Sequence, residues 1–210
     1  GGGVLLNQCP HNLDLLQWIC GLPVKVQAFC HTGKWHDIEV EDDVTAYLEF
    51  ANGATGVFVT TTGDAPGTNR FEITLERAKL VCENDKLTMY ELEVNEREYC
   101  YTATEGFAKP AGHFVEVETD GENLQHVGVL RAFAAHILHG APLVAEGKEG
   151  INGLTLSNAM HLSSWLGRPV QIPFDEDLFL EKLNELRSSS KEKTNVTETT
   201  FNTEGTYGSK

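Results

Sequence analysis

The spacing of apolar residues changes along the chain, and it predicts one helix, then a run of strands, then further helices. Residues 10–20 carry apolar side chains at helical spacing, and Gly21-Leu22-Pro23 ends that pattern. Residues 24–31 alternate apolar and polar side chains, which is typical of a half-buried strand. Helical spacing returns over 123–139, 147–166 and 175–187.

The clearest local signal is a hairpin centred on Asn52-Gly53. Apolar and polar residues alternate over 44–50, and the chain returns over 55–62. Asn-Gly between two such runs favours a type I′ turn, because both turn positions need a positive φ. The chain between 70 and 117 holds further strand-like segments: 70–76, 78–83, 86–93, 96–102 and 114–117.

This order of elements predicts an α+β fold. No strand alternates with a helix in a βαβ rhythm, and no glycine-rich phosphate fingerprint follows a strand, since Gly1-Gly2-Gly3 lacks the G-x-G-x-x-G spacing. The predicted domain ends near residue 187. Residues 188–210 are mostly Ser, Thr, Asn, Glu and Lys with almost no apolar side chain, which predicts a disordered tail.

The composition is that of a soluble globular protein and excludes several partners. Hydrophobic residues make up 40% and charged residues 22% of the 210 positions. The net charge of −15 argues against nucleic acid and an anionic membrane as partners, since both need clustered Lys and Arg. No apolar run approaches the roughly 20 residues of a membrane span. The five cysteines lack C-x-x-C spacing, so free thiols in the reducing cytoplasm are expected.

The opening segment carries the strongest candidate chemistry. Asn7, Pro10 and His11 stand where the first helix should begin. A histidine there is a candidate general base, because imidazole exchanges protons near neutral pH. Taken alone, such a histidine is more often structural, Asn7 could be a helix cap, and Asp14 could be an acidic residue that favours the first helical turn.

Residues 1–14, GGGVLLNQCPHNLD, resemble the opening of the C-terminal domain of the Gfo/Idh/MocA oxidoreductases. The family motif there reads roughly GG-G-x-L-x-D-x-G-x-H-x-x-D. The resemblance continues through the hairpin at 44–62, the turn Gly67-Thr68-Asn69-Arg70 and the segment Val129-Leu130-Arg131-Ala132-Phe133, and it covers about residues 1–187. It implies an open, mostly antiparallel sheet with helices packed on one face.

The same resemblance implies a two-domain enzyme that transfers hydride between a nicotinamide and a sugar- or cyclitol-like alcohol. An N-terminal Rossmann domain that holds NAD or NADP is expected outside this sequence, so the chain alone should not turn over. Residues 1–187 would then bind substrate and form a homo-oligomer, most simply a dimer, through the sheet face that carries no helices. The alternative is a non-catalytic, sheet-mediated assembly or binding module.

Three residues of the opening segment take roles from the resemblance. His11 matches the family histidine near the reacting hydroxyl and would be the general acid/base, or a group that polarises that hydroxyl. Asn7 stands where many members carry Asp. An amide can orient a substrate hydroxyl but cannot exchange its proton, so this departure keeps the non-catalytic alternative open. Asp14 matches a later acidic position and could orient the imidazole.

Other residues could line the same substrate site. Trp35 and His36, in the polar loop 32–42, could form a rim over a sugar, although a plain strand connection is the commoner reading. Arg70 could hold a substrate anion, but a surface ion pair is commoner. Glu41-Asp42-Asp43 could imitate a cation site, yet contiguous carboxylates usually form a solvated loop. The histidines lack metal-ligand spacing, so no metal is expected.

Overall fold

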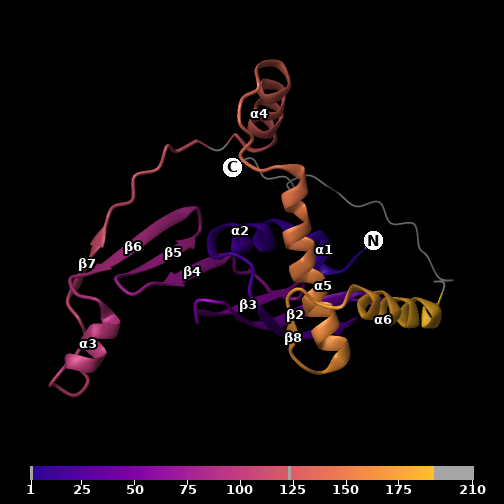
Figure 1. Cartoon of the computed structure of the whole chain (residues 1–210), viewed down its shortest axis with the longest axis horizontal. Coiled ribbons are helices and arrows are strands. Elements are labelled where there is room, and N and C mark those ends of the chain that lie inside the picture. Colours follow the sequence, from indigo (N-terminus) through magenta and orange to yellow (C-terminus); the bar gives the residue numbers. More distant parts are fainter. Residues whose placement is uncertain (1, 123, 192–210) are drawn as a thin grey trace. The chain divides into compact units, whose positions relative to one another are not determined.

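The computed structural model describes residues 2–122 and 124–191, which fall into two compact units. Unit 1 combines the residues up to Gly63 with those from Lys148 onward, and unit 2 spans Asp64–Gly147. Each unit holds a four-stranded antiparallel sheet (Figure 1). The predicted α+β class is therefore confirmed, with the strands divided between two sheets.

The strands of unit 1 run in the order β3-β2-β1-β8, and every neighbouring pair is antiparallel. The 3₁₀ turn η1 (Gly147–Glu149) lies where the two units meet in the sequence. The other elements of unit 1 are α1 (Val4–Asn7), α2 (Pro10–Cys20), β1 (Lys25–Thr32), β2 (Glu41–Glu49), β3 (Thr55–Thr61), α5 (Gly150–Leu166), β8 (Val170–Gln171) and α6 (Glu176–Ser189).

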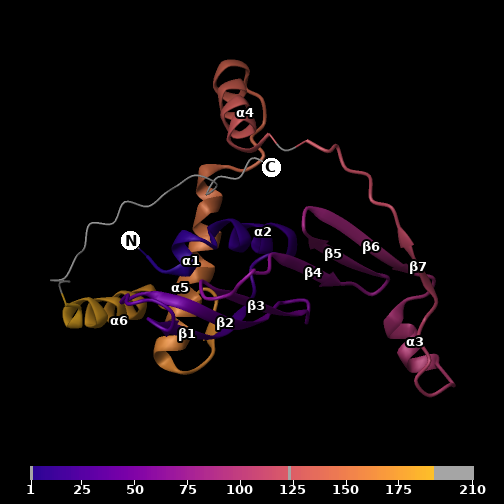
Figure 2. The ribbon, with the colours of Figure 1, turned by 180° about the vertical axis from the view of Figure 1, so that it is seen from behind.

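One face of the unit 1 sheet is buried beneath helices. Successive side chains of a strand point to opposite faces, so every second residue of β1 and β2 enters the core. α5 packs on β1, and α2 packs on α5 (Figure 2). The innermost side chains, each at most 2% exposed, are Val4, Leu5, Leu13, Val26, Val44, Leu48, Leu156 and Met160.

The opposite face of this sheet exposes large apolar side chains. Phe29 is 59% exposed, Tyr47 43%, Val57 69% and Val59 64%. A shallow hollow in the same face is lined by Gln27, Phe29, Thr45, Ala46, Tyr47 and Val57. An apolar patch of this kind is typical of an interaction surface.

Unit 2 contains an antiparallel sheet in the order β4-β5-β6-β7. Its turn between β5 and β6 is formed by Asn84 and Asp85, whose φ angles of 53° and 58° fit a two-residue type I′ turn. The elements of unit 2 are β4 (Arg70–Thr74), β5 (Ala78–Glu83), β6 (Lys86–Leu92), α3 (Glu96–Thr102), β7 (Gly112–Val115) and α4 (Gln125–His139).

The turn predicted at Asn52-Gly53 has a different geometry. The hairpin itself is confirmed, with Glu49 paired to Thr55. Gly53 has a φ of 85°, but Asn52 keeps a negative φ, and the Gly53 N–H donates to the Phe50 carbonyl at 3.0 Å. This is a type I turn followed by a left-handed glycine, not a type I′ turn.

The strand predicted over 96–102 is wrong, because this segment is the helix α3. The side chain of Asn95 accepts hydrogen bonds from the backbone N–H groups of Arg97 and Glu98, which caps the helix. Glu96 and Glu98 then lie in the first turn, where the helix dipole favours negative charge. The helix cap and the acidic first turn therefore outweigh the strand-like alternation of apolar and polar residues in this segment.

The long helices match their predicted positions closely. α2 has the predicted bounds, and Asp175 caps α6 by accepting from the Leu178 N–H at 3.0 Å. α6 continues to Ser189, so the first two residues of the predicted tail are helical, and the rest of that prediction, from residue 192, lies outside the described residues. No described helix combines the length and apolar character needed to cross a membrane.

Candidate functional site

Three strands of unit 1 end near the junction between its first two helices. Since neighbouring strands are antiparallel, the last residues of β1, the first of β2 and the last of β3 lie at one end of the sheet. Cys9, between α1 and α2, holds its Sγ 2.9 Å from the Oγ1 of Thr60 in β3. Residues 7–11, 32–43 and 60–62 therefore form one region, which we call the strand-end region.

Asn7 and His11 occupy the helix junction. Asn7 is the last residue of α1, and His11 is the second residue of α2, after Pro10 at the first position. Proline suits that position because its fixed φ is helical and its missing N–H is not needed. Both side chains are exposed, and neither has a hydrogen bond or ion pair within the described part of the chain. They are therefore available to a ligand.

Asp14 is held by its own helix. Its Oδ1 accepts a hydrogen bond from the Nε2 of Gln17 at 2.9 Å. Gln17 is 8% exposed and accepts in turn from the Nδ2 of Asn152 in α5 at 3.1 Å. These two contacts link α2 to α5 through Asp14, Gln17 and Asn152. They favour a structural role for Asp14, and not the orientation of the His11 imidazole.

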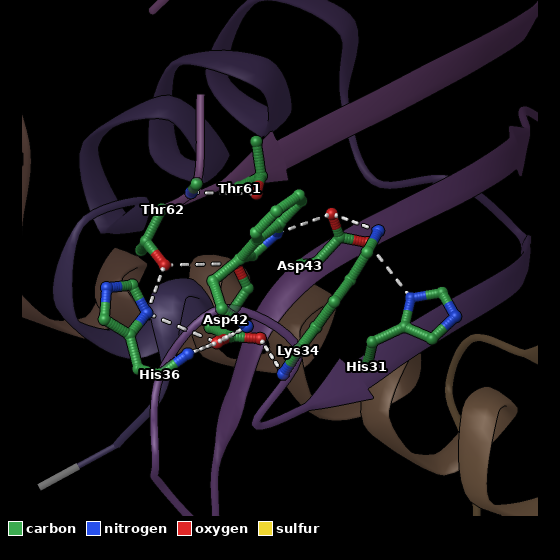
Figure 3. A network of polar contacts seen from close by, with 9 residues as sticks. His31, Lys34, His36, Asp42, Asp43, Thr61 and Thr62 are labelled. Atoms are coloured by element: carbon green, nitrogen blue, oxygen red, sulfur yellow. Dashed lines mark hydrogen bonds and ion pairs between the residues drawn. The ribbon is translucent and has the colours of Figure 1, made fainter. Parts of the chain in front are cut away.

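The loop before β2 is ordered by one buried carboxylate (Figure 3). Asp42, 1% exposed, accepts hydrogen bonds from the backbone N–H groups of Lys34, Trp35 and His36 at 3.0, 2.8 and 2.9 Å. The Nδ1 of His36 lies 3.3 Å from Asp42 and 3.2 Å from the Oγ1 of Thr62. Burial raises the pKa of Asp42, but these N–H donors outweigh it, so the pKa lies below its usual value.

Asp43 fixes the side chains of the same loop (Figure 3). Its carboxylate lies 2.9 Å from the Nζ of Lys34, 3.3 Å from the Nε1 of Trp35 and 3.0 Å from the Nδ1 of His31. The hydrogen bond from Lys34 is the main reason why the pKa of Asp43 falls to about 2. The indole of Trp35 packs so closely on Gly63 that a Cβ there would lie 2.2 Å from it. Trp35 is thus a half-exposed aromatic surface in a fixed position.

Glu41 points into the interior, behind the helix junction. It is 5% exposed, and its Oε1 accepts a hydrogen bond from the Leu5 N–H at 3.0 Å. Its Oε2 lies 3.0 Å from the Nε2 of His161 in α5. Burial raises the pKa of Glu41, but the contact with His161 and the backbone donors lower it below its usual value.

The solvated-loop interpretation of Glu41-Asp42-Asp43 is therefore wrong. These residues open β2, and the first two are buried with hydrogen-bond partners. Within the part of the chain that the structure describes, no cluster of three or more His, Cys, Asp or Glu side chains could hold a metal ion.

Arg70 belongs to unit 2, where it is the first residue of β4. Its guanidinium contacts the carboxylates of Glu72 at 2.5 Å and Glu83 at 2.7 Å. Glu72 also pairs with Lys79 on β5. Arg70 is thus part of a cross-strand ion-pair network, the commoner of its two expected roles, and its use as an anion ligand is not supported by these contacts.

Sequence reasoning missed the buried residues behind the site. The loop and the helix junction are contacted by the buried residues Asp42, Glu41 and His161, and the local sequence marks only the first of these as buried. One signal was present: apolar and polar positions alternate through β2 in phase with Val44, which places Asp42 on the core side. The partner in α5 is distant in the sequence, so no local pattern could indicate it.

Solved structures with a similar fold are oxidoreductases. The WlbA dehydrogenase from Bordetella pertussis, in complex with NADH and UDP-GlcNAcA, matches with a TM-score of 0.61 and 22% identity over 83% of this chain and 46% of that one. The aldose-aldose oxidoreductase from Caulobacter crescentus, complexed with glycerol, also gives a TM-score of 0.61 and 22% identity, over 81% of this chain and 48% of that one. These likenesses show the fold.

Residues 1–81 match the family model described as GFO/IDH/MocA C-terminal domain, which confirms the resemblance to this oxidoreductase family. The uncharacterized protein y4oX of Sinorhizobium fredii (strain NBRC 101917 / NGR234) is 24% identical over 170 residues, which is 80% of this chain and 47% of its own length. The chain thus spans about half the length of the relatives that it matches.

Proposed function

We propose that this chain is the substrate-binding and dimerisation part of an NAD(P)-dependent oxidoreductase. The reaction would transfer hydride between a nicotinamide and a sugar- or cyclitol-like alcohol. One observation carries the proposal: His11, at the family's histidine position, has an exposed imidazole with no partner in the described chain. The imidazole is therefore open to a substrate hydroxyl.

In this reaction the residues of this chain would transfer a proton and orient the substrate hydroxyl. Nicotinamide would be held mainly by parts of the full-length protein outside this sequence, and it would supply the hydride acceptor at its C4. As the hydride leaves the carbinol carbon, the His11 imidazole takes the hydroxyl proton, directly or through water, and a carbonyl forms. Asn7 would orient the hydroxyl through its amide, because it cannot exchange a proton.

The loop side chains support a sugar-like substrate. Trp35 is 50% exposed and fixed by Asp43, so its indole could stack on the CH groups of a sugar ring. His36, held by Asp42, could donate or accept a hydrogen bond at the rim. The two structural relatives named above were solved with UDP-GlcNAcA and with glycerol, and both compounds carry several hydroxyl groups.

We further propose that two copies of the full-length protein pair through the exposed face of the unit 1 sheet. The apolar side chains of Phe29, Tyr47, Val57 and Val59 on that face support this pairing. Replacing Val57 with Lys should convert the dimer to a monomer in sedimentation velocity, because the charge would be buried at the interface. Sedimentation of the variant as a dimer contradicts this surface assignment.

A cytoplasmic location is supported by the five free cysteines.

A non-catalytic assembly module remains the second candidate, because Asn7 replaces the family's usual Asp and the sheet face is apolar. That alternative predicts a histidine packed against its own core, whereas His11 is exposed. The geometry therefore favours the enzyme.

Calorimetry with NAD(H) and NADP(H), on this chain and on the full-length protein in parallel, tests the proposal. We expect binding by the full-length protein and none by this chain, because on this proposal the cofactor would be held by a domain outside it. A full-length protein that binds neither cofactor contradicts the enzyme assignment and leaves the assembly module.

A further inference from the structure

The one-turn helix α1 is too short to hold Asn7 in place by itself. It contains four residues, and no side chain caps its N-terminus locally. A helix of this length is unstable in isolation, since nucleation is costly and few internal hydrogen bonds form. Its position must therefore come from contacts with the rest of unit 1.

Glu41 supplies the missing cap from β2. Its carboxylate accepts from the N–H of Leu5, the second residue of α1, across 36 positions of sequence. A negative charge at this end of a helix also interacts favourably with the helix dipole. The Val4 and Leu5 side chains, 2% and 0% exposed, anchor the same turn in the core.

The glycine run brings the chain against this carboxylate. A Cβ on Gly3 would lie 2.1 Å from the carboxyl carbon of Glu41, so only glycine fits at that position. On its other side the carboxylate meets His161, whose ring stacks on Trp165 at 5.4 Å between centroids. Glu41 is thus enclosed between α1 and α5.

We infer that Glu41, fixed by His161, is a positioning residue that holds α1 and thereby places Asn7 and His11 for reaction. This inference rests on the proposed function. Among the described residues, no hydrogen bond or ion pair joins Glu41 to the side chain of Asn7 or His11. It acts through the backbone of α1, and the chain passes from Asn7 to His11 through only three residues.

The isosteric variant Glu41→Gln should preserve positioning. Its amide oxygen can accept from the Leu5 N–H, while its NH₂ group donates to a neutral His161. Glu41→Ala removes both contacts. The matched control is Ser163→Ala, because Ser163 is also fully buried and bonds the Ala28 N–H at 3.0 Å and the Arg168 carbonyl at 2.8 Å, away from α1.

The first readout is amide hydrogen exchange of residues 4–9 in the full-length protein. We expect faster exchange there in Glu41→Ala, and wild-type exchange in Glu41→Gln and Ser163→Ala. Unchanged exchange in Glu41→Ala overturns the inference whether or not the protein is an enzyme.

The second readout is steady-state hydride transfer to NAD⁺ or NADP⁺ with a panel of glucose, myo-inositol and UDP-N-acetylglucosamine. We expect kcat to fall about 10- to 100-fold in Glu41→Ala, while the KM of the cofactor stays unchanged, because small misplacements of reacting groups are costly. Glu41→Gln should recover kcat to within about threefold. If Glu41→Ala does not fold, Glu41→Asp replaces it, because its side chain is shorter by one methylene. The same changes in hydrogen exchange and kcat are expected of that variant.

A folded Glu41→Ala or Glu41→Asp variant with wild-type kcat contradicts the inference. Absence of cofactor binding and hydride transfer in the wild-type protein contradicts the proposed function instead, and hydrogen exchange then still decides whether Glu41 holds α1.

Discussion

The helix junction and the loop before β2 lie at the same end of the unit 1 sheet, but their side chains are held in opposite ways. Trp35 and His36 are fixed by carboxylates, through both backbone and side-chain contacts. Asn7 and His11 have no side-chain partner within the described residues, and only the backbone beneath them is anchored. The difference shows that carboxylate contacts fix the side chains of the loop, whereas the side chains of Asn7 and His11 are free to contact a ligand.

Asp42→Ala is expected to have the largest effect on the stability of the loop before β2. Three backbone N–H groups would lose their acceptor, so residues 34–36 should lose their fixed conformation. We expect a clearly lower melting temperature by circular dichroism and a higher KM for the substrate alcohol. Asp64→Ala, an exposed carboxylate outside this network, is the control. An unchanged melting temperature in Asp42→Ala would show that the loop does not depend on this carboxylate.

Asn7→Ala should separate function from stability. The side chain has no protein partner to lose, so the melting temperature should stay at the wild-type value. Loss of one substrate hydrogen bond should raise the substrate KM about tenfold, which corresponds to about 1.4 kcal/mol. Steady-state kinetics of the full-length protein measure this change. A fall in melting temperature with unchanged kinetics would assign Asn7 a structural role.

Acid should weaken the carboxylate contacts that hold the loop before β2 and the helix α1. The folded pKa of Asp43 is about 2 and its ordinary value is 3.8, and the pKa values of Asp42 and Glu41 are also lowered. A depressed carboxyl pKa contributes stability that is present above the unfolded value and lost as the pH falls through the folded one. Stability should therefore decline below pH 3.8 toward about 2. In denaturant titrations, Asp43→Asn should show a smaller decline over that range.

The smallest effect is expected at Arg70. Its guanidinium is already engaged by Glu72 and Glu83 in exposed ion pairs, so Arg70→Met should leave substrate KM and kcat within about twofold of wild type. Raised salt should have equally little effect on activity. A tenfold rise in the substrate KM of this variant would instead identify Arg70 as a substrate ligand.

The helix start at Pro10 and His11 could be predicted from the sequence, but the buried carboxylates that hold the loop and α1 could not. Pro10 and His11 stand in a local helix-start pattern, which any reader of the sequence can recognise. The burial of Glu41 depends on Leu5 and His161, which come from distant segments. Three adjacent carboxylates look solvated because burying a charge is costly, unless tertiary contacts compensate it.

The two misread elements have local physical causes. Over 96–102 the alternation of the sequence suggests a strand, but the Asn95 cap and two acidic residues in the first turn stabilise a helix. At Asn52-Gly53 the loop is longer than two residues, so Asn52 need not adopt a positive φ. At Asn84-Asp85 the strands are joined by only two residues, and the type I′ turn forms there instead.

The central claim is that His11 takes the proton of the reacting hydroxyl. It is tested most directly by hydride transfer in full-length His11→Ala beside His126→Ala, since His126 is also the exposed second residue of a helix, α4. We predict that kcat falls about 10²- to 10⁴-fold in His11→Ala alone, with both melting temperatures unchanged. A folded His11→Ala protein with wild-type kcat would contradict the account.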